Sequence, residues 1–196
     1  RDRSKIGRNA HRINQGLPPQ SGGRDADFFF IERTDPSQVL EEIAELCAKR
    51  LPRYAQVDPI EGIQVLCPMR RGVVGVEHLN QKLQDALNPL RSEEDELFSL
   101  GDRYRLGDKV MQLRNNYDKG VFNGDIGRVA RIDGDREELV VEFPEGSDTI
   151  RVAYRQKDLE ELCLAYAISV HKAQGSEYPV VVMPILTEHS WMLQRN

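Results

Sequence analysis

The sequence predicts an α/β fold that is interrupted by a small antiparallel β-barrel. Strand and helix signals alternate over residues 27–104, which is typical of a parallel sheet with crossover helices. Short strand signals separated by turns replace them over residues 105–157. The α/β pattern returns at residues 158–196. We therefore expect one α/β domain in two pieces with the barrel inserted between them, preceded by a leading segment at residues 1–26.

The elements of the α/β part follow from apolar patterns and their punctuation. The continuous apolar run at residues 28–31 predicts a strand buried on both faces. Asp35 and Pro36 form an N-cap and first-turn pair at the start of a helix. Residues 62–67 predict a second strand. A second helix should follow it, because four apolar residues recur at helical spacing: Val76, Leu79, Leu83 and Leu87.

The barrel is predicted from short strand candidates with turn-forming residues between them. The candidates are residues 109–113, 126–132, 138–143 and 149–154. Clusters of Gly, Asn, Asp and Pro separate them, as expected of tight turns. Beyond the barrel, the stretch at residues 169–177 is interpreted as a helix that ends in a polar, glycine-containing turn. The apolar run at residues 179–185 then predicts a buried strand.

Composition limits the possible classes of function. The chain has 196 residues and a net charge of −5, so any nucleic-acid site must be local. Three cysteines without paired spacing indicate reduced, buried thiols and no metal site. We see no membrane span or signal peptide, and we expect a cytoplasmic protein. The start without Met and the amphipathic end are interpreted as those of a piece of a longer protein.

The first candidate site is the polar turn at residues 169–177. A hydroxyl, an imidazole and an amine precede a glycine turn that carries an amide, a second hydroxyl and a carboxylate. Such a set suits a phosphate chain on one side and a nucleotide sugar on the other. The alternative is an ordinary helix end, with Gly175 as its left-handed cap. The candidates are Ser169, His171, Lys172, Gln174, Gly175, Ser176 and Glu177.

A second candidate site follows the strand predicted at residues 62–67. Met69, Arg70 and Arg71 lie between this strand and the next helix, and ligands of open α/β sheets bind at the carboxyl ends of strands. Two guanidinium groups there are able to grip phosphates. The alternative is a solvated loop whose charges are incidental and bind no phosphate.

A third candidate lies within the predicted barrel, at Asn115, Asn116 and Tyr117. An aromatic ring beside amides suits an unpaired base, which stacks on the ring while the amides bond to its edge or to phosphate. The alternative is a turn built from residues that favour turns, with a hairpin at Asn123 and Gly124.

Several segments, taken in order, resemble the RecD-like helicases of superfamily one. The last of them, HKAQGSE, is similar to motif V of that group in its form HKxQGxE. Five other runs also resemble the family: NAHRINQG at 9–16, PMRRGVVGV at 68–76, GDKVMQ at 107–112 with NNY at 115–117, FNGDIG at 122–127, and LAYA at 164–167. The resemblance covers essentially the whole chain and is nearest to the stand-alone RecD type, with the exodeoxyribonuclease V α subunit as the broader relative.

The resemblance implies a RecA-like second motor domain, a P-loop NTPase-type parallel sheet with helices on both faces, and an inserted SH3-like barrel. It implies an ATP-dependent 5′-to-3′ DNA helicase or translocase. Two sets of residues acquire roles by motif. DNA contacts are implied for Met69, Arg70, Arg71, Asn115, Asn116, Tyr117, Ser169, His171 and Lys172, and nucleotide contacts for Gln174, Gly175, Ser176 and Glu177.

The chain departs from the full family in ways that affect the expected activity. It contains no GxxxxGK[ST] loop and no motif VI arginine, so we expect no catalytic residue and no ATPase activity from this piece alone. ATP and Mg are expected in the full-length enzyme, and neither is expected on this piece. The implied partners are single-stranded DNA, the first motor domain of the same protein and, as a further alternative, subunits of a nuclease complex.

Two alternatives to the helicase remain open at this point. One is a non-catalytic nucleic-acid-binding module that keeps only the fold. The other is part of a TraA-type relaxase–helicase, which shares these motifs.

Overall fold

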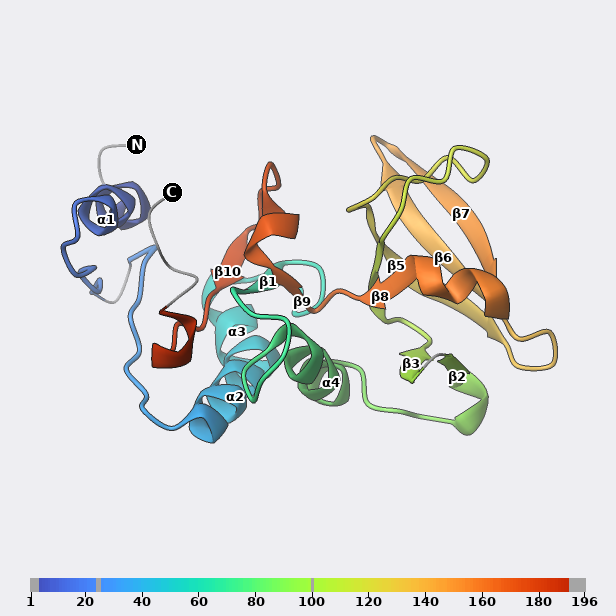
Figure 1. The fold of residues 1–196 in the computed structure, drawn as a ribbon, viewed down its shortest axis with the longest axis horizontal. Coiled ribbons are helices and arrows are strands. Elements are labelled where there is room, and N and C mark those ends of the chain that lie inside the picture. The colour runs from blue at the N-terminus through green and yellow to red at the C-terminus, as the bar shows by residue number, and fades with distance from the viewer. Residues whose placement is uncertain (1–3, 24–25, 100, 191–196) are drawn as a thin grey trace. The chain divides into compact units, whose positions relative to one another are not determined.

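The computed structural model describes residues 4–23, 26–99 and 101–190 of the chain (Figure 1). Two compact units are present, residues 1–34 and residues 35–196. The predicted ranges 1–26, 27–104 and 158–196 include residues 1–3, 24–25, 100 and 191–196, which lie outside the described residues.

The first unit contains helix α1, Lys5–Asn14, and an irregular segment after it. Gly16 ends the helix region with a φ of 75°, a conformation that glycine adopts without strain. Asn9 is buried, and its side-chain amide donates to Gln20 O at 2.9 Å while its oxygen accepts from Gln20 N at 2.8 Å. The amide of Asn9 thus holds the segment beyond Gly16 against the helix.

The strand predicted at residues 28–31 is wrong. These residues are irregular, and Phe29, Phe30 and Ile31 are exposed. A continuous apolar run specifies neither a period nor a partner. A strand forms only where a neighbouring backbone pairs with it, and none of the described strands pairs with these residues.

The second unit begins with the predicted helix, which the structure divides into three parts. Helix α2 is Pro36–Glu45, and the Asp35 side chain accepts from Ser37 N and Gln38 N, so the predicted N-cap is confirmed. A π-helical turn, η1, covers Leu46–Arg50, and helix α3 covers Leu51–Ala55. Gln56 ends this run with a φ of 54°.

A three-stranded parallel sheet forms the centre of the α/β part. Strand β1, Ile63–Cys67, lies between β9, Ala167–Ser169, and β10, Val180–Val182. Helix α4, Val76–Leu87, follows β1 as predicted. One face of β1 presents Ile63, Val65 and Cys67 to a core that includes Ile43, Cys47, Leu79 and Leu83, so the helices cover this face.

The opposite face of β1 has a different cover in the described residues. Leu66 packs there with Met111, Ala165, Ile168 and Ala173. Met111 comes from the antiparallel strands at residues 109–164, which we call the β domain, and Ala165 from the segment that returns from it. Ile168 belongs to the neighbouring strand β9, and Ala173 to a short 3-10 turn. The predicted fold has helices on both faces. Here the β domain and its return segment take the place of a second helical layer.

The region around motif V differs from the sequence-based expectation. The helix predicted within residues 169–177 is not found: Ser169 ends strand β9, and a single 3-10 turn, η4, covers Val170–Ala173. The predicted buried strand is β10, which is short and leaves Val181 exposed. Ala167 and Ile168 are buried, and Ala167–Ser169 pair with β1, so the chain reaches the polar turn as a strand.

The four strands predicted for the β domain are confirmed. Together with a fifth strand, β8, they form an antiparallel sheet in the order β7-β6-β5-β4-β8. Their bounds are Lys109–Gln112 for β4, Ile126–Asp133 for β5, Glu138–Glu145 for β6, Asp148–Arg155 for β7 and Leu162–Leu164 for β8. Strand β8 adds to the sheet beyond the predicted limit at residue 157. A separate hairpin pairs β2, Glu96–Ser99, with β3, Asp102–Arg105.

The predicted closure of these strands into a barrel is not found in the part of the chain that the structure describes. Edge strands β7 and β8 do not pair with each other there. Alternating strands predict an antiparallel sheet, but closure depends on strand tilt and stagger, which the pattern does not contain. The remaining turns are 3-10: η2, Glu93–Asp95; η3, Gln156–Glu161; and η5, Thr187–His189.

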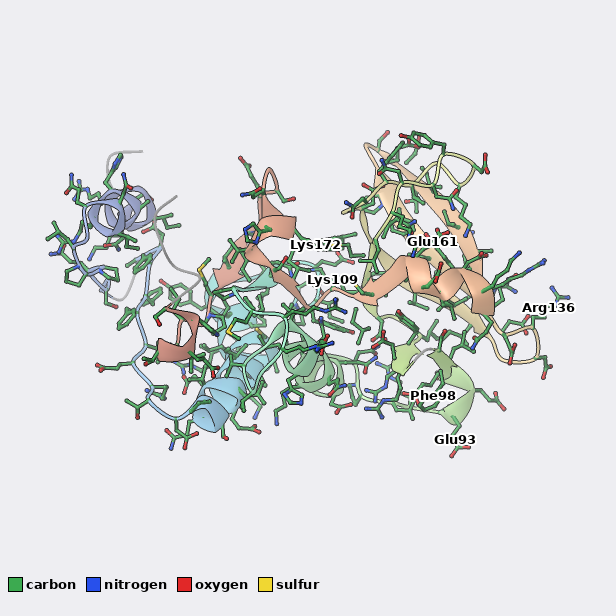
Figure 2. All side chains as sticks on the ribbon, in the orientation of Figure 1. Glu93, Phe98, Lys109, Arg136, Glu161 and Lys172 are labelled. Carbon is green, nitrogen blue, oxygen red and sulfur yellow. The ribbon has the colours of Figure 1, made fainter. Side chains whose placement is uncertain are left out.

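Two buried charged residues, Asp108 and Lys109, lie where the chain enters the β domain. The Asp108 carboxylate accepts hydrogen bonds from Gln84 Nε2 at 2.6 Å and from Tyr166 OH at 2.7 Å. Lys109, labelled in Figure 2, donates from Nζ to Ile60 O at 3.0 Å and to Ile63 O at 3.2 Å. Burial lowers the pKa of this ammonium to about 8, against the weaker attraction of Glu61 and Asp58. Lys109 thereby joins β4 to the start of β1.

Gly127 in β5 allows a close approach of the strands, which gives the first prediction. A Cβ there would lie 2.5 Å from Glu142 O and 2.7 Å from Val141 Cγ1. Gly127→Ala should therefore lower the free energy of unfolding by about 1–3 kcal/mol, as overpacking does. The control is Gly134→Ala, which meets no atom within 4 Å. Urea unfolding of both variants measures the difference, and equal stabilities would contradict the prediction.

Lys109 should give the fold a specific dependence on pH. Its pKa is about 8 when folded, against 10.5 for an ordinary lysine, so between these values the unfolded chain binds more protons. Stability then rises with pH across this window, by roughly 3 kcal/mol at most. We expect wild type to gain stability relative to Lys109→Met from about pH 8 to about pH 10.5. Denaturant unfolding at several pH values measures it, and parallel curves for the two proteins would contradict it.

Candidate nucleic-acid and nucleotide interface

The first two candidate sites lie at the same edge of the parallel sheet. Cys67, the last residue of β1, is aligned with Ser169, the last residue of β9. Because the strands are parallel, the loop at residues 68–75 and the turn at residues 170–177 leave the sheet side by side. The structure thus brings together two segments that are about a hundred residues apart. This is the edge at which ligands of open α/β sheets bind.

The loop at residues 68–75 is folded tightly onto the start of α4. Val76 N donates to Met69 O at 3.0 Å, and Glu77 N donates to Arg70 O at 3.1 Å. A Cβ on Gly75 would lie 2.5 Å from the Arg71 carbonyl carbon, so only glycine fits this approach. These two first-turn amides of α4 already have partners. A phosphate here would therefore depend on the arginine side chains more than on the helix terminus.

The predicted side chains of this loop are not equally available. Arg70 is largely exposed, and its Nε lies 2.9 Å from Glu77 Oε1, which neutralises part of its charge. Arg71 is exposed and has no ion-pair partner among the described residues. Met69 is partly buried. Of the three, Arg71 has the charge that is most available to a ligand.

In the turn after β9, the predicted DNA-side residues lie on the short 3-10 turn η4. The Ser169 hydroxyl accepts from Lys172 N at 3.3 Å and caps this turn. The side chain of Lys172, labelled in Figure 2, places Nζ 4.0 Å from Met111 Sδ on β4. His171 is exposed. The ammonium of Lys172 therefore lies near the root of the β domain and keeps its charge unpaired among the described residues.

The predicted nucleotide-side residues form an open turn. Gly175 has a φ of 83°, and Ser176 N donates to Ala173 O at 3.1 Å, which closes the turn. Gln174, Ser176 and Glu177 are exposed, and their side chains make no hydrogen bond within the described residues. Their amide, hydroxyl and carboxylate fit the hydroxyl groups of a nucleotide sugar. No acidic or metal-binding cluster that could hold Mg occurs among the described residues.

In the loop of the third candidate site, the side chain of Asn116 is already used in hydrogen bonds within the protein. Asn116 Nδ2 donates to Glu161 Oε2 at 3.1 Å, and its oxygen accepts from Lys119 N at 3.1 Å. Asn115 uses its oxygen for Asn123 N at 2.9 Å. The Asn116 amide thus shapes the loop, whereas the remaining amide hydrogens of Asn115 point to no described partner.

Tyr117 is the most exposed aromatic residue of this loop, at 78% of its surface. Phe122, at 46%, lies against it edge to face, with ring centroids 5.9 Å apart and planes at 77°. Sequence reasoning missed Phe122 as a candidate, although it lies in the FNGDIG run. Two exposed rings on a loop that is closed by the Asn116–Val121 bridge form a preset surface for stacking.

Comparisons with known proteins match two parts of the chain. A family model for the ATP-dependent RecD-like DNA helicase SH3 domain matches residues 79–143. A model for the UvrD-like helicase C-terminal domain matches residues 164–196.

No helix in the described residues is long and apolar enough to cross a membrane.

Two curated relatives have substantial similarity to the chain. It is 40% identical over 134 residues, 68% of its length, to an ATP-dependent RecD2 DNA helicase of Deinococcus radiodurans. It is 30% identical over 170 residues, 83% of its length, to the RecBCD enzyme subunit RecD of Mycolicibacterium smegmatis. The chain spans 18% and 28% of these two relatives, respectively.

Among solved structures, the chain is similar to a Pif1 helicase from Bacteroides in complex with ADP-AlF3 and single-stranded DNA. The identity is 19%, the TM-score is 0.47, and the match covers 77% of this chain and 40% of that one. This likeness is too distant to bear on the site. The two helicase domain matches and the RecD relatives, by contrast, agree with the motifs at the sheet edge and in the β domain, and they place the chain in the RecD-like helicase family.

Proposed function

We propose that the chain is part of an ATP-dependent DNA helicase or translocase that moves 5′ to 3′. In it, the chain contributes single-stranded DNA contacts and one wall of the ATP site. The observation that supports this most directly is the alignment of Cys67 with Ser169, because it puts the arginine loop and motif V at one edge of the sheet. Its membership of the RecD-like family supplies the activity, which we carry over as a proposal.

On the DNA side, the proposed contacts are cationic and aromatic. Arg71 and Lys172 have charges that no described carboxylate neutralises, so each is free to pair with a phosphate. Arg70 has to exchange its pairing with Glu77 for a phosphate, at little cost because the pair is exposed. Tyr117 offers a face for a base. Asn115, Asn116, Met69, Ser169 and His171 complete the proposed set.

On the nucleotide side, Gln174, Gly175, Ser176 and Glu177 would line the sugar of ATP. Glu177 accepts from a ribose hydroxyl in this proposal, and the left-handed Gly175 lets the turn pass close to the nucleotide. Hydrolysis of ATP, bound with Mg, would supply the free energy for movement. The groups that stabilise phosphoryl transfer would come from parts of the protein outside this chain, among them the first motor domain, which is the proposed partner across the ATP site. Subunits of a nuclease complex are a further proposed partner.

The DNA side of the proposal predicts a loss of affinity on neutralisation of the arginine loop. Replacing both Arg70 and Arg71 with Ala in this chain should weaken binding to an oligothymidine roughly tenfold at low salt and flatten its dependence on salt, because fewer counterions are released. Fluorescence anisotropy across a salt series measures both quantities. The matched control replaces Arg131 and Arg151, which are exposed and paired with Glu138 and Glu142. If both double variants bind alike, the loop is not a DNA contact.

In the full-length enzyme, substitutions on the two sides of motif V should affect different kinetic constants. Glu177→Ala should raise the KM for ATP roughly tenfold or more, because a hydrogen bond to a charged group is lost. Lys172→Ala should instead raise the DNA concentration needed for half-maximal ATPase activity, since its backbone cap to Ser169 remains. ATPase rates measured against ATP and against single-stranded DNA give both values.

Two results of the same assay would contradict the proposal. A shift of both variants along the same axis by similar amounts would reject the proposed division of this turn. The isolated chain serves as the negative control, because it lacks the phosphate loop and should show no hydrolysis. DNA-stimulated ATPase activity of the isolated chain would contradict the proposed role of the first motor domain.

A further inference from the structure

Helix α4 carries three side-chain amides at intervals of four residues: Asn80, Gln84 and Asn88. Residues spaced in this way lie along one face of a helix. Asn80 and Gln84 are buried, and Asn88 lies at the C-terminal end of the helix. We call these three residues the amide row. A buried amide is costly unless its hydrogen bonds are made, so a row of them needs a specific partner surface.

Asn80 makes its hydrogen bonds to the segment that joins the β domain to β9. Its Nδ2 donates to Leu164 O at 3.1 Å and to Ala167 O at 2.9 Å. Its Oδ1 accepts from Ala167 N at 2.8 Å. One side chain thus makes three bonds to backbone groups on both sides of Ala165 and Tyr166. These groups include the N–H and the C=O of the first residue of β9.

The other two amides bond to the root of the β domain. Gln84 Nε2 donates to Arg103 O at 2.8 Å and to Asp108 Oδ2 at 2.6 Å. Asn88 Nδ2 donates to Leu106 O at 3.0 Å and to Asp108 Oδ1 at 2.8 Å. The amide row therefore holds the segment that enters the β domain and the segment that leaves it against the same helix.

Apolar contacts would hold α4 in place without specifying its position along its axis. Hydrogen bonds to particular backbone atoms do specify it, because a shift by one residue would leave buried groups unpaired. Helix α4 begins directly after the loop that carries Arg70 and Arg71, and Asn80 is one turn from that start. Strand β9 ends at Ser169, where motif V begins. Asn80 therefore links the helix that follows one of these loops to the strand that precedes the other.

We propose that Asn80 is a positioning residue for motif V. It fixes the start of β9 on α4, and through β9 it sets where Ser169 and Lys172 lie relative to the Arg70 and Arg71 loop, while Gln84 and Asn88 hold the β domain to the same helix. This inference rests on the proposed function only in the roles given to those loops. The positioning itself is a property of this chain and needs neither DNA nor ATP.

The test compares Asn80→Ala with Leu83→Ala in this chain by amide hydrogen exchange. Leu83 is a core residue one turn further along α4, and its replacement destabilises the fold without removing a hydrogen bond. Both variants are measured at urea concentrations that equalise their global stability. Asn80→Ala should then raise exchange at residues 167–172 about tenfold above Leu83→Ala, the effect of losing a buried hydrogen bond. Exchange in β6 should be equal in the two variants.

A conservative variant keeps the test informative if Asn80→Ala does not fold. Asn80→Asp retains the acceptor for Ala167 N but loses both donors, and protonation of the new carboxyl restores one of them. Exchange at residues 167–172, corrected for its intrinsic pH dependence, should therefore fall as the pH is lowered through the pKa of that carboxyl, which burial raises. The same pattern of exchange in Asn80→Ala and Leu83→Ala, or no rescue on protonation, overturns the proposal. Oligothymidine binding by wild type tests the proposed function separately.

Discussion

The buried carboxylate of Asp108 is the group on which the joining of the two parts of the second unit depends. It accepts hydrogen bonds from Gln84 Nε2, Asn88 Nδ2, Arg105 N and Tyr166 OH, all between 2.6 and 2.8 Å. Burial raises the pKa of this carboxyl, and these donors offset part of that rise. A buried acid is tolerated only when its lone pairs are used in this way. The buried charge of Asp108 is thus unfavourable by itself, and its hydrogen bonds to the three segments that it joins offset this cost.

Those donors come from places that explain how a β domain can be inserted into an α/β sheet. Gln84 and Asn88 belong to α4, Arg105 ends β3 before the chain enters the antiparallel sheet, and Tyr166 lies on the return to β9. The chain therefore enters and leaves the insertion at one carboxylate. Lys109, the next residue, bonds to Ile60 O and Ile63 O beside β1. Adjacent residues of opposite charge thus hold the insertion to the helix and to the sheet.

Much of the fold was predictable because local chemistry and tertiary packing agree there. Asp35 caps its helix as its position before Pro36 indicates, and the spacing of Leu79 and Leu83 correctly identifies the buried face of α4. The strand at residues 28–31 and the helix at the start of motif V were predicted wrongly, and strand pairing decides both cases. The apolar run at 28–31 has no described strand to pair with, whereas the segment that leads into motif V pairs with β1.

The candidate site was predictable in its position and less so in its detail. Strand-end loops were expected to bind ligands, and the alignment of Cys67 with Ser169 brings two of them together. The amide row was not predictable, because polar residues at intervals of four occur equally on solvated helix faces. Asn116 was a DNA candidate by residue type, yet its side chain bonds to Glu161 and Lys119. Residue type alone does not show which amides the fold itself uses.

The charge pattern of the described β domain limits how it can take part in binding. Lys119 is paired with Asp158, and Arg131 and Arg151 are paired with Glu138 and Glu142. Each exposed pair adds little stability, but it cancels most of the field that would attract a phosphate. Tyr117 and Phe122 are therefore the groups there with the most to gain from a nucleic acid, through stacking. In the proposed function, attraction of phosphates falls instead to Arg71 and Lys172, one on each of the two loops that leave the sheet side by side. The proposed division between charge and stacking then follows the division between the two parts of the fold.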